Sequence, residues 1–254
     1  YGGLLHGPSS RPLRLALAGL ALSSLLLAGC SGRSVDGIWI NQAAIDAAVA
    51  DDSLREALLA YGPNLEWRVQ AARGLARFSN GFEQGEGRLQ ALAEGGWQVD
   101  FGLDEHEQLR RSGAELLQGE GPSWPAQRFR RYAASVDDSP LGSHFETALY
   151  RAYLGGSWLI TQGLGERGLV LFHADGRVEG LPGAERYALC LAGDCAAMAG
   201  EHDSLWLQQG AQGQTWLFRR EGEQLRIFQA INQSAADEMP SYQPGAEVWR
   251  LQRD

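Results

Sequence analysis

The sequence contains no lysine, and all 22 of its basic residues are arginine. This absence excludes chemistry that needs a lysine amine: Schiff-base formation, the phosphate-binding lysine of a P-loop and a Ser-Lys catalytic dyad. Positive charge is also scarce, since 31 acidic residues give the chain a net charge of −9. Proteins bind nucleic acids largely by neutralising phosphates, so we expect no nucleic-acid partner.

Reaction motifs are missing as well. There is no Gly-x-Ser-x-Gly elbow of the hydrolase type. His106 and Glu107 begin like the zinc motif His-Glu-x-x-His, but Arg110 stands where the second histidine is needed. We expect residues 104–107 to form a solvated turn ahead of a strand. The other mature histidines have no local partner that suggests a triad: His144, His173 and His202. We therefore predict no catalytic residue, no metal site and no cofactor.

One glycine pattern imitates a cofactor motif. Gly163, Gly165 and Gly168 spell Gly-x-Gly-x-x-Gly, which binds dinucleotides only where it opens a helix. The residues that follow, Leu169 to Phe172, form a short apolar run that ends at a turn. We interpret the glycines as a hairpin connection between two strands.

The N-terminal segment has the layout of a signal peptide. Arg11 and Arg14 precede an uncharged apolar stretch, residues 15–28. The stretch is shorter than the roughly 20 residues that a membrane-spanning helix needs. We expect residues 1–29 to be cleaved, and we treat residues 1–10 as extra upstream sequence that takes no part in the fold.

The end of this segment, Leu27-Ala28-Gly29-Cys30, resembles the lipobox of bacterial lipoprotein precursors. The resemblance implies diacylglycerol on the Cys30 sulfur, cleavage before Cys30 and a membrane surface as partner. Cleavage removes two arginines and no acidic residue, so the net charge of −9 becomes −11. Ser31 follows, and the aspartate that retains enterobacterial lipoproteins in the inner membrane is not present there. We therefore expect the outer membrane, with the protein on its periplasmic face.

Two of the three cysteines remain once Cys30 carries lipid. Cys190 and Cys195 form an even pair in an oxidising compartment, which predicts a disulfide. Their spacing is not the Cys-x-x-Cys of redox enzymes or zinc knuckles. So short a ring contributes about 2 kcal/mol in the loop model and would stabilise a local hairpin.

The mature chain contains signs of a duplication. Two Ser-x-x-Glu capping boxes, Ser53 with Glu56 and Ser143 with Glu146, each predict the start of a helix. Further matched landmarks follow both boxes in the same order.

The landmarks pair Trp67 with Trp158, and Glu107 with Glu223 inside a shared Glu-x-Glu-Gln-Leu-Arg pattern. Turn dipeptides occur in both copies, Asn80-Gly81 and Asp175-Gly176. The offset between copies grows toward the C-terminus, which predicts an insertion near residues 182–206 that contains the cysteine pair.

The segments after the helices alternate like strands with one buried face, as Trp97, Val99 and Phe101 do with their polar neighbours. We predict an α+β fold of two tandem related units, each an N-terminal helix plus a meandering antiparallel sheet. The units are 30–132 and 144–254, joined by a linker at 133–143 that is rich in Ser, Asp, Pro and Gly.

The pattern of phenylalanine, turn and strand resembles small lipocalin-like lipoprotein barrels of the META type. The cysteine and glycine signature of that family is not reproduced, so no residue role is transferred from it.

These observations predict a membrane-anchored, non-catalytic envelope lipoprotein that binds a protein or another envelope component. One alternative is a periplasm-facing carrier of an apolar ligand, in which the aromatic residues line a cavity. A second alternative is a hydrolase whose active site is assembled from distant parts of the chain.

Overall fold

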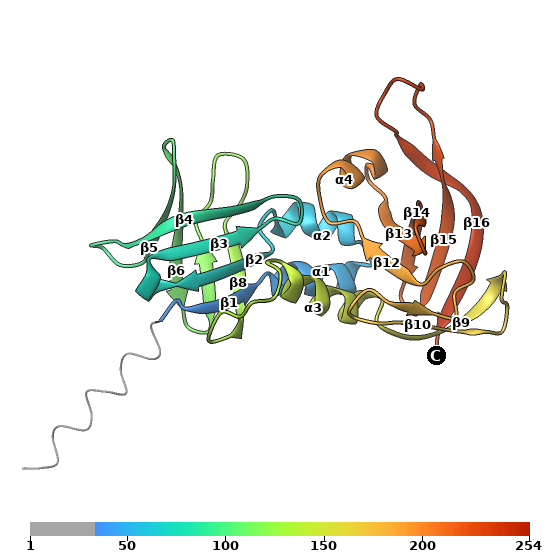
Figure 1. Cartoon of the computed structure of the whole chain (residues 1–254), viewed down its shortest axis with the longest axis horizontal. Coiled ribbons are helices and arrows are strands. Elements are labelled where there is room, and N and C mark those ends of the chain that lie inside the picture. The colour runs from blue at the N-terminus through green and yellow to red at the C-terminus, as the bar shows by residue number, and fades with distance from the viewer. Residues whose placement is uncertain (1–33) are drawn as a thin grey trace, which may run out of the picture. The chain divides into compact units, whose positions relative to one another are not determined.

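The computed structural model describes residues 34–254. The predicted signal segment 1–29 and the predicted lipid-attachment residue Cys30 lie outside the described residues. Residues 35–254 make one compact unit that contains two tandem antiparallel β-barrels and four α-helices (Figure 1). The predicted α+β class, with tandem units of helix and antiparallel meander, is confirmed.

The first barrel is a closed eight-stranded meander, in which each strand pairs with the next and the last pairs with the first. Side chains that point inward fill it, among them Trp39, Trp67 and Phe129, each at most 1% exposed. Its strands are β1 (Gly37–Ile40), β2 (Glu66–Gln70), β3 (Leu75–Ser79), β4 (Gln84–Ala91), β5 (Trp97–Gly102), β6 (Glu105–Ser112), β7 (Glu115–Gln118) and β8 (Gln127–Ala133), with a 3-10 turn η2 (Ala71–Arg73) after β2.

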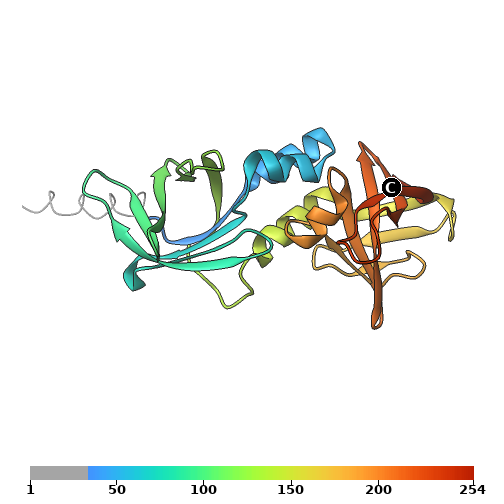
Figure 2. The ribbon, with the colours of Figure 1, turned by 90° about the horizontal axis from the view of Figure 1, so that it is seen from above.

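Two helices, α1 (Gln42–Asp51) and α2 (Leu54–Tyr61), lie between β1 and β2. They pack against each other as a helical hairpin, which both ribbon views show (Figures 1 and 2). The Asn41 side chain caps α1 by accepting a hydrogen bond from its first turn. Ser53 Oγ caps α2 by accepting from the Glu56 amide, as its capping box predicts.

The second barrel is also a meander of eight strands. Its first strand pairs with its last, and the bridge between Arg177 and Arg186 joins the two ends of the sheet. Its elements are α3 (Ser143–Tyr153), β9 (Gly156–Gly163), β10 (Leu169–Phe172), β11 (Val178–Glu179), β12 (Arg186–Leu189), α4 (Asp194–Ala199), β13 (Asp203–Gln209), β14 (Gln212–Glu221), β15 (Gln224–Asn232) and β16 (Tyr242–Arg253). The glycines 163, 165 and 168 connect β9 to β10, which confirms their interpretation as a hairpin connection.

Helices supply much of the core of the second barrel. One apolar cluster contains strand residues such as Phe218 and Ile227 together with Ile45 of α1, Leu54 of α2 and Tyr153 of α3. All five are at most 2% exposed. The helical hairpin between the first two strands of the first barrel therefore belongs to the core of the second.

The first strands of the two barrels contain the same local arrangement around a buried tryptophan. Trp39 in β1 and Trp158 in β9 are both fully buried, and each indole donates to the carbonyl four residues earlier at 2.9 Å. A glycine with positive φ precedes each tryptophan by two positions, Gly37 at +123° and Gly156 at +108°. These conformations favour glycine, and both barrels begin with Gly-x-Trp.

The last strand of each barrel covers that tryptophan. Arg131 in β8 is the strand partner of Trp39, and Arg253 in β16 is the strand partner of Trp158. The guanidinium carbons lie 4.7 Å and 4.3 Å from the respective ring centroids, within the range of a cation–π contact.

This geometry shows which residues of the two barrels correspond, and the correspondence differs from the predicted one. Trp158 corresponds to Trp39, whereas Trp67 lies in the second strand of its barrel. Glu107 lies inside β6, whereas Glu223 occupies the turn between β14 and β15, so these two are not equivalent either. The predicted pairing was wrong because both Trp67 and Trp158 follow a helix, and α1 and α2 are inserted after the first strand of only one barrel.

The cysteine pair lies in the connection between the antiparallel strands β12 and β13. Cys190 follows β12 and Cys195 lies in α4, so the ring joins a strand end to a short helix. Within residues 34–254, no helix is long and apolar enough to cross a membrane.

Candidate functional site

The predicted disulfide is present: the Cys190 and Cys195 sulfurs are bonded, with Cα atoms 5.9 Å apart. The other predicted site residue, Cys30, lies outside the described residues. The structure therefore locates one of the two predicted sites.

His106 and Glu107 do not converge on a metal. Both lie in β6, where neighbouring side chains point to opposite faces of the sheet. Glu107 is partly buried, and burial raises its pKa, whereas His106 is exposed. No group of three or more potential metal ligands is found in residues 34–254.

His144 has partners that the sequence analysis missed. Its Nε2 lies 2.9 Å from Ser139 Oγ and 2.8 Å from Asp137 Oδ2. The three residues fall within one short stretch of the chain, so the close spacing in the linker was a usable signal. Together they have the composition of a hydrolase triad.

The geometry is not that of a triad. In a triad, the serine and the aspartate bond to different nitrogens of the histidine, whereas here both contact Nε2. Ser139 Oγ also donates to Asp137 and accepts from Arg68 Nη2 at 3.1 Å. The Ser139 and His144 contacts lower the pKa of Asp137 to about 2, with the Ser139 hydroxyl as the largest cause. This cluster fixes the linker and does not activate a nucleophile.

Strand β2 holds the same linker through a buried ion pair. Glu66 and Arg68 side chains are 0% and 1% exposed, and Arg68 Nε lies 2.9 Å from Glu66 Oε2. Arg68 also donates to the carbonyls of Ser139 at 2.6 Å and Pro140 at 2.8 Å. The two charged groups therefore bind to each other and to groups of the protein, as the burial of an ion pair requires.

Glu66 also caps α3, in place of the predicted Ser143–Glu146 box. Its carboxylate accepts from the Gly142 amide at 2.8 Å and the Phe145 amide at 3.0 Å. The N-cap residue is Gly142, and Ser143 Oγ is buried without a partner. The helix begins where the box predicts, but the capping contact is different because Gly142 is the N-cap and the Glu66 carboxylate of β2 accepts from the Phe145 amide.

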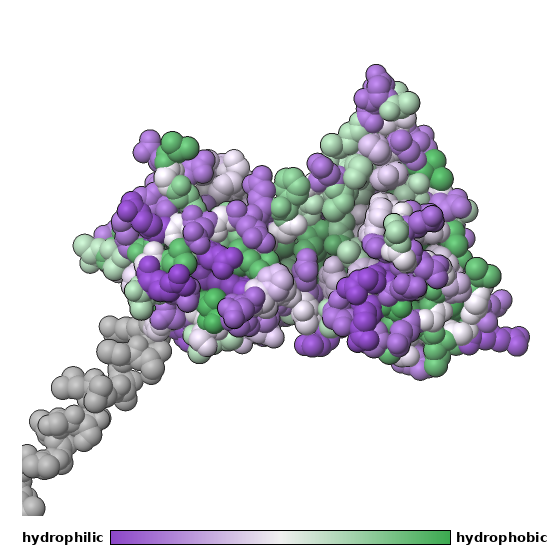
Figure 3. Space-filling view, viewed as in Figure 1, coloured by the Kyte–Doolittle hydropathy of each residue, from purple (hydrophilic) through white to green (hydrophobic). Residues whose placement is uncertain are grey.

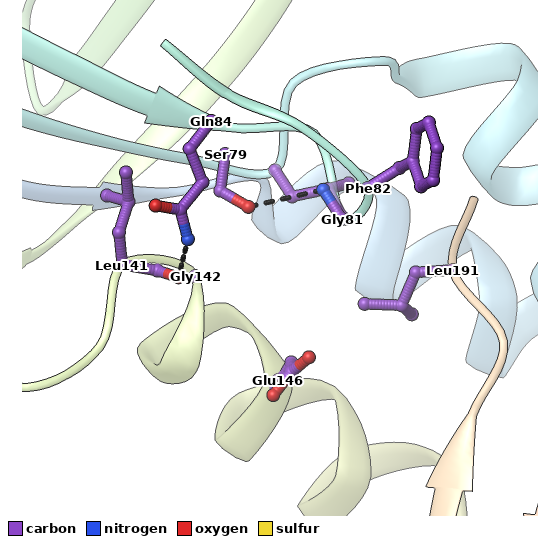
Figure 4. A pocket seen from close by; sticks show the side chains of 9 residues that line it. Ser79, Gly81, Phe82, Gln84, Leu141, Gly142, Glu146 and Leu191 are labelled. Atoms are coloured by element: carbon purple, nitrogen blue, oxygen red, sulfur yellow. Dashed lines mark hydrogen bonds between the residues drawn. The ribbon is translucent and has the colours of Figure 1, made fainter. Parts of the chain in front are cut away.

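Glu146, the second residue of the predicted capping box, lines a cavity. Glu146 faces the space beneath Gly81 and Leu191, as Figure 4 shows. The volume of this cavity is about 130 Å³. Four separate segments of the chain form it, and their lining residues are Leu65, Ser79, Gly81, Phe82, Gln84, Leu141, Gly142, Glu146 and Leu191.

The side chain of Glu146 is exposed at this cavity. Within residues 34–254 it makes no hydrogen bond or ion pair. Partial burial raises its pKa, and the nearby negative charge of Glu66 raises it further. Solvent still reaches the side chain, so the cavity is open to an incoming group. We refer to this site as the Glu146 cavity.

The disulfide ring forms one wall of the Glu146 cavity. Gly81, at φ +87°, lies so close that a β-carbon there would be 2.9 Å from the Leu191 Cβ. A β-carbon on Gly193 would meet the Phe82 ring at 2.2 Å. The turn between β3 and β4 and the ring at 190–195 thus fit together only because both contain glycine.

Apolar side chains are exposed on the turn and on α2. Phe82 is 61% exposed at the cavity, and Leu59 and Tyr61 of α2 are 65% and 45% exposed. Figure 3 shows apolar surface over α2. A second groove, of about 330 Å³, lies on the first barrel between Glu86, Arg88 and Asp100, which give it a charged lining.

Comparison with protein-family models, with curated proteins and with solved structures finds no significant match.

Proposed function

We propose that the chain is a non-catalytic envelope lipoprotein, anchored through Cys30 to the periplasmic face of the outer membrane, that binds a protein partner. The lipobox-like sequence and the polar residues after Cys30 support the anchor. The size of the Glu146 cavity and the residues that line it support a protein as the partner.

The volume of the Glu146 cavity is the observation that carries the proposal. Small-molecule sites usually measure about 300–1,000 Å³. A cavity of about 130 Å³ holds one end of a side chain instead of a whole ligand. Protein interfaces concentrate binding energy where a side chain from one partner enters a pocket on the other. The exposed Phe82, which lines the cavity, would supply apolar contact beside such an anchor.

The barrel interiors favour a binding protein over a carrier of apolar ligands. Aromatic side chains such as Trp39 and Trp67 occupy the first barrel, and α1, α2 and α3 contribute to the core of the second. The geometry at His144 likewise favours binding over hydrolysis, since the Ser139 hydroxyl donates to Asp137.

The anchor is tested by fractionation. The full-length precursor should sediment with the outer membrane on a sucrose gradient, and Cys30→Ser should move it to the soluble fraction. Recovery of Cys30→Ser in the membrane fraction, or of the wild type in the inner membrane, would contradict this part of the proposal.

Binding is tested by photo-crosslinking in intact cells, followed by mass spectrometry. A photoreactive phenylalanine at position 82 should crosslink one defined protein, because Phe82 lies at the cavity. The matched control carries it at position 103, where Leu103 is 98% exposed on the β5–β6 turn of the first barrel. No protein adduct at position 82, or the same adducts at both positions, would contradict the proposed function.

A further inference from the structure

We propose that the Glu146 cavity receives the charged end of a lysine or arginine side chain from the protein partner. This inference rests on the proposed function and specifies the chemistry of its binding site. Three properties of the cavity support it: the unpaired carboxylate, the hydrogen-bonding groups around it and the small volume with a mostly polar lining.

The first property is a carboxylate without a cation. Glu146 would ordinarily close a capping box, but Glu66 occupies the start of α3 and leaves it unpaired. The arginines that border this region are engaged elsewhere. Arg68 pairs with Glu66, and Arg55 donates to the Leu191 carbonyl at 3.5 Å. A cation from outside the chain would therefore meet no internal competitor among these contacts.

The second property is the excess of hydrogen-bond acceptors. Gln84 Nε2 donates to the Leu141 carbonyl at 3.3 Å. The side-chain oxygen of Gln84 takes no part in that bond and can accept from another donor. Ser79 Oγ accepts from the Gly81 amide at 3.2 Å and retains a lone pair. With the Glu146 carboxylate, these groups match a ligand that only donates. Lysine ammonium and arginine guanidinium donate and never accept, and unlike the tryptophan indole, which also only donates, they carry a positive charge.

The third property is the small volume of the cavity and its lining. Leu65, Leu141 and Leu191 line it but are nearly fully buried, so most of the surface that an incoming group meets is polar. Lysine and arginine suit such a site, because a methylene stem carries a charged head. At roughly 30 Å³ per water, the cavity volume of about 130 Å³ corresponds to the last few heavy atoms of either side chain.

Electrostatics favour such an occupant. The negative charge of the nearby Glu66 favours a cation beside Glu146, and water at the exposed side chain screens part of this attraction. The mature chain carries a net charge of −11 after loss of two arginines from a chain at −9, so a basic partner is also attracted over a longer range.

The direct test uses two probes that differ only in charge. Nα-acetyl-lysine N-methylamide carries the ammonium, and Nα-acetyl-norleucine N-methylamide has the stem without it. The side-chain carboxyl carbon of Glu146 is followed by NMR in the full-length protein in detergent micelles. The lysine probe should bind with a dissociation constant on the order of millimolar and lower the pKa of Glu146. The norleucine probe should bind at least tenfold more weakly.

Two variants complete the test. Glu146→Gln should weaken the lysine probe at least tenfold. Glu94→Gln, which changes an exposed acid on the β4–β5 turn of the first barrel, should have no effect. Equal binding of the two probes, or equal binding of the lysine probe to wild type and Glu146→Gln, would overturn the inference.

The source of the cation is decided in the cell. The partner peptide crosslinked from position 82 should contain a lysine or arginine beside the attachment point, and Glu146→Gln should reduce the yield at least fivefold. A defined partner whose peptide has no basic residue, or whose yield is unchanged in Glu146→Gln, overturns the inference and leaves the proposed function standing. If no partner is crosslinked, the proposed function itself fails.

Discussion

The two barrels share a strand order but are filled in different ways. The first is filled by its own strands, through Trp39, Trp67 and Phe129. The second takes helices into its core, including α1 and α2, which come from the chain of the first barrel. The difference shows that a repeated unit need not complete its own core. A long connection in one copy can complete the core of the next.

Buried polar contacts fix these helices to the second barrel. The Asp203 carboxylate accepts from the first two amides of α2, Leu54 at 3.0 Å and Arg55 at 2.7 Å, and from the Tyr153 hydroxyl at 2.8 Å. Burial raises the pKa of Asp203, which is the cost of placing this charge in the core. A carboxylate at a helix N-terminus recovers part of that cost through the helix dipole.

The end of α1 is held by a cation. Arg220, 7% exposed, donates to the Val49 carbonyl at 3.0 Å and to Asp52 Oδ1 at 2.8 Å. The second barrel therefore supplies a negative group to the start of α2 and a positive group to the end of α1, which suits both helix dipoles.

The largest effect should come from removing the carboxylate that holds α2. Asp203→Ala leaves two amides and the Tyr153 hydroxyl without their acceptor, so we expect a loss of roughly 3 kcal/mol in the free energy of unfolding. Urea denaturation followed by tryptophan fluorescence measures it. The control Asp237→Ala, at an exposed position of the same barrel, should be neutral. A loss below roughly 1 kcal/mol would break the proposed dependence of the second barrel on α2.

Removing the disulfide should have the next largest effect. The double variant Cys190→Ser, Cys195→Ser should lose about 2 kcal/mol, because a short closed loop restricts the unfolded chain only modestly. The loss should appear in the unfolding transition of the second barrel, which contains the ring. An equal loss in the first barrel would show that the ring stabilises both.

The next prediction tests a feature that the two barrels share, an arginine stacked on a buried tryptophan. Arg131→Met in the first barrel and Arg253→Met in the second should each cost about 1 kcal/mol through lost stacking on Trp39 and Trp158. Thermal unfolding of both variants gives the comparison. Very unequal costs would show that the two arginines are equivalent in position but not in function.

The smallest effect concerns pH and the surface of the second barrel. Arg250 and then Arg226 hold the pKa of Glu247 at about 2, below its ordinary value of 4.5. Because the pKa is lowered in the folded state, this contribution is full above the unfolded pKa and is lost as pH falls toward 2. Wild type should exceed Glu247→Gln in stability at pH 6, and the difference should shrink by pH 3. A difference that grows on acidification would contradict this assignment.

Local signals explain which parts of the fold were predictable. The alternation of Trp97, Val99 and Phe101 gave the antiparallel meander, since strand periodicity is a property of neighbouring residues. The Ser53 cap and the Cys190–Cys195 bond depend on residues close in sequence, and both are present.

The candidate site was not predictable because it depends on a distant residue. Gly142 and Glu66 are 76 positions apart, and no periodicity in the chain reveals that Glu66 will take over the cap of α3. The sequence therefore placed Glu146 in a capping box and gave no sign of a cavity. The Gly-x-Trp spacing at Gly37 and Gly156 does not fix the register of the repeat either, because it occurs again at Gly95 before β5.

The central claim is that α1 and α2 belong to the core of the second barrel. Hydrogen exchange followed by mass spectrometry tests it directly when wild type is compared with Asp203→Ala. Amides in residues 54–61 and in β13 to β15 should lose protection together, while β3 to β6 of the first barrel keep theirs. Unchanged protection in α2, or an equal loss across the first barrel, would contradict the claim.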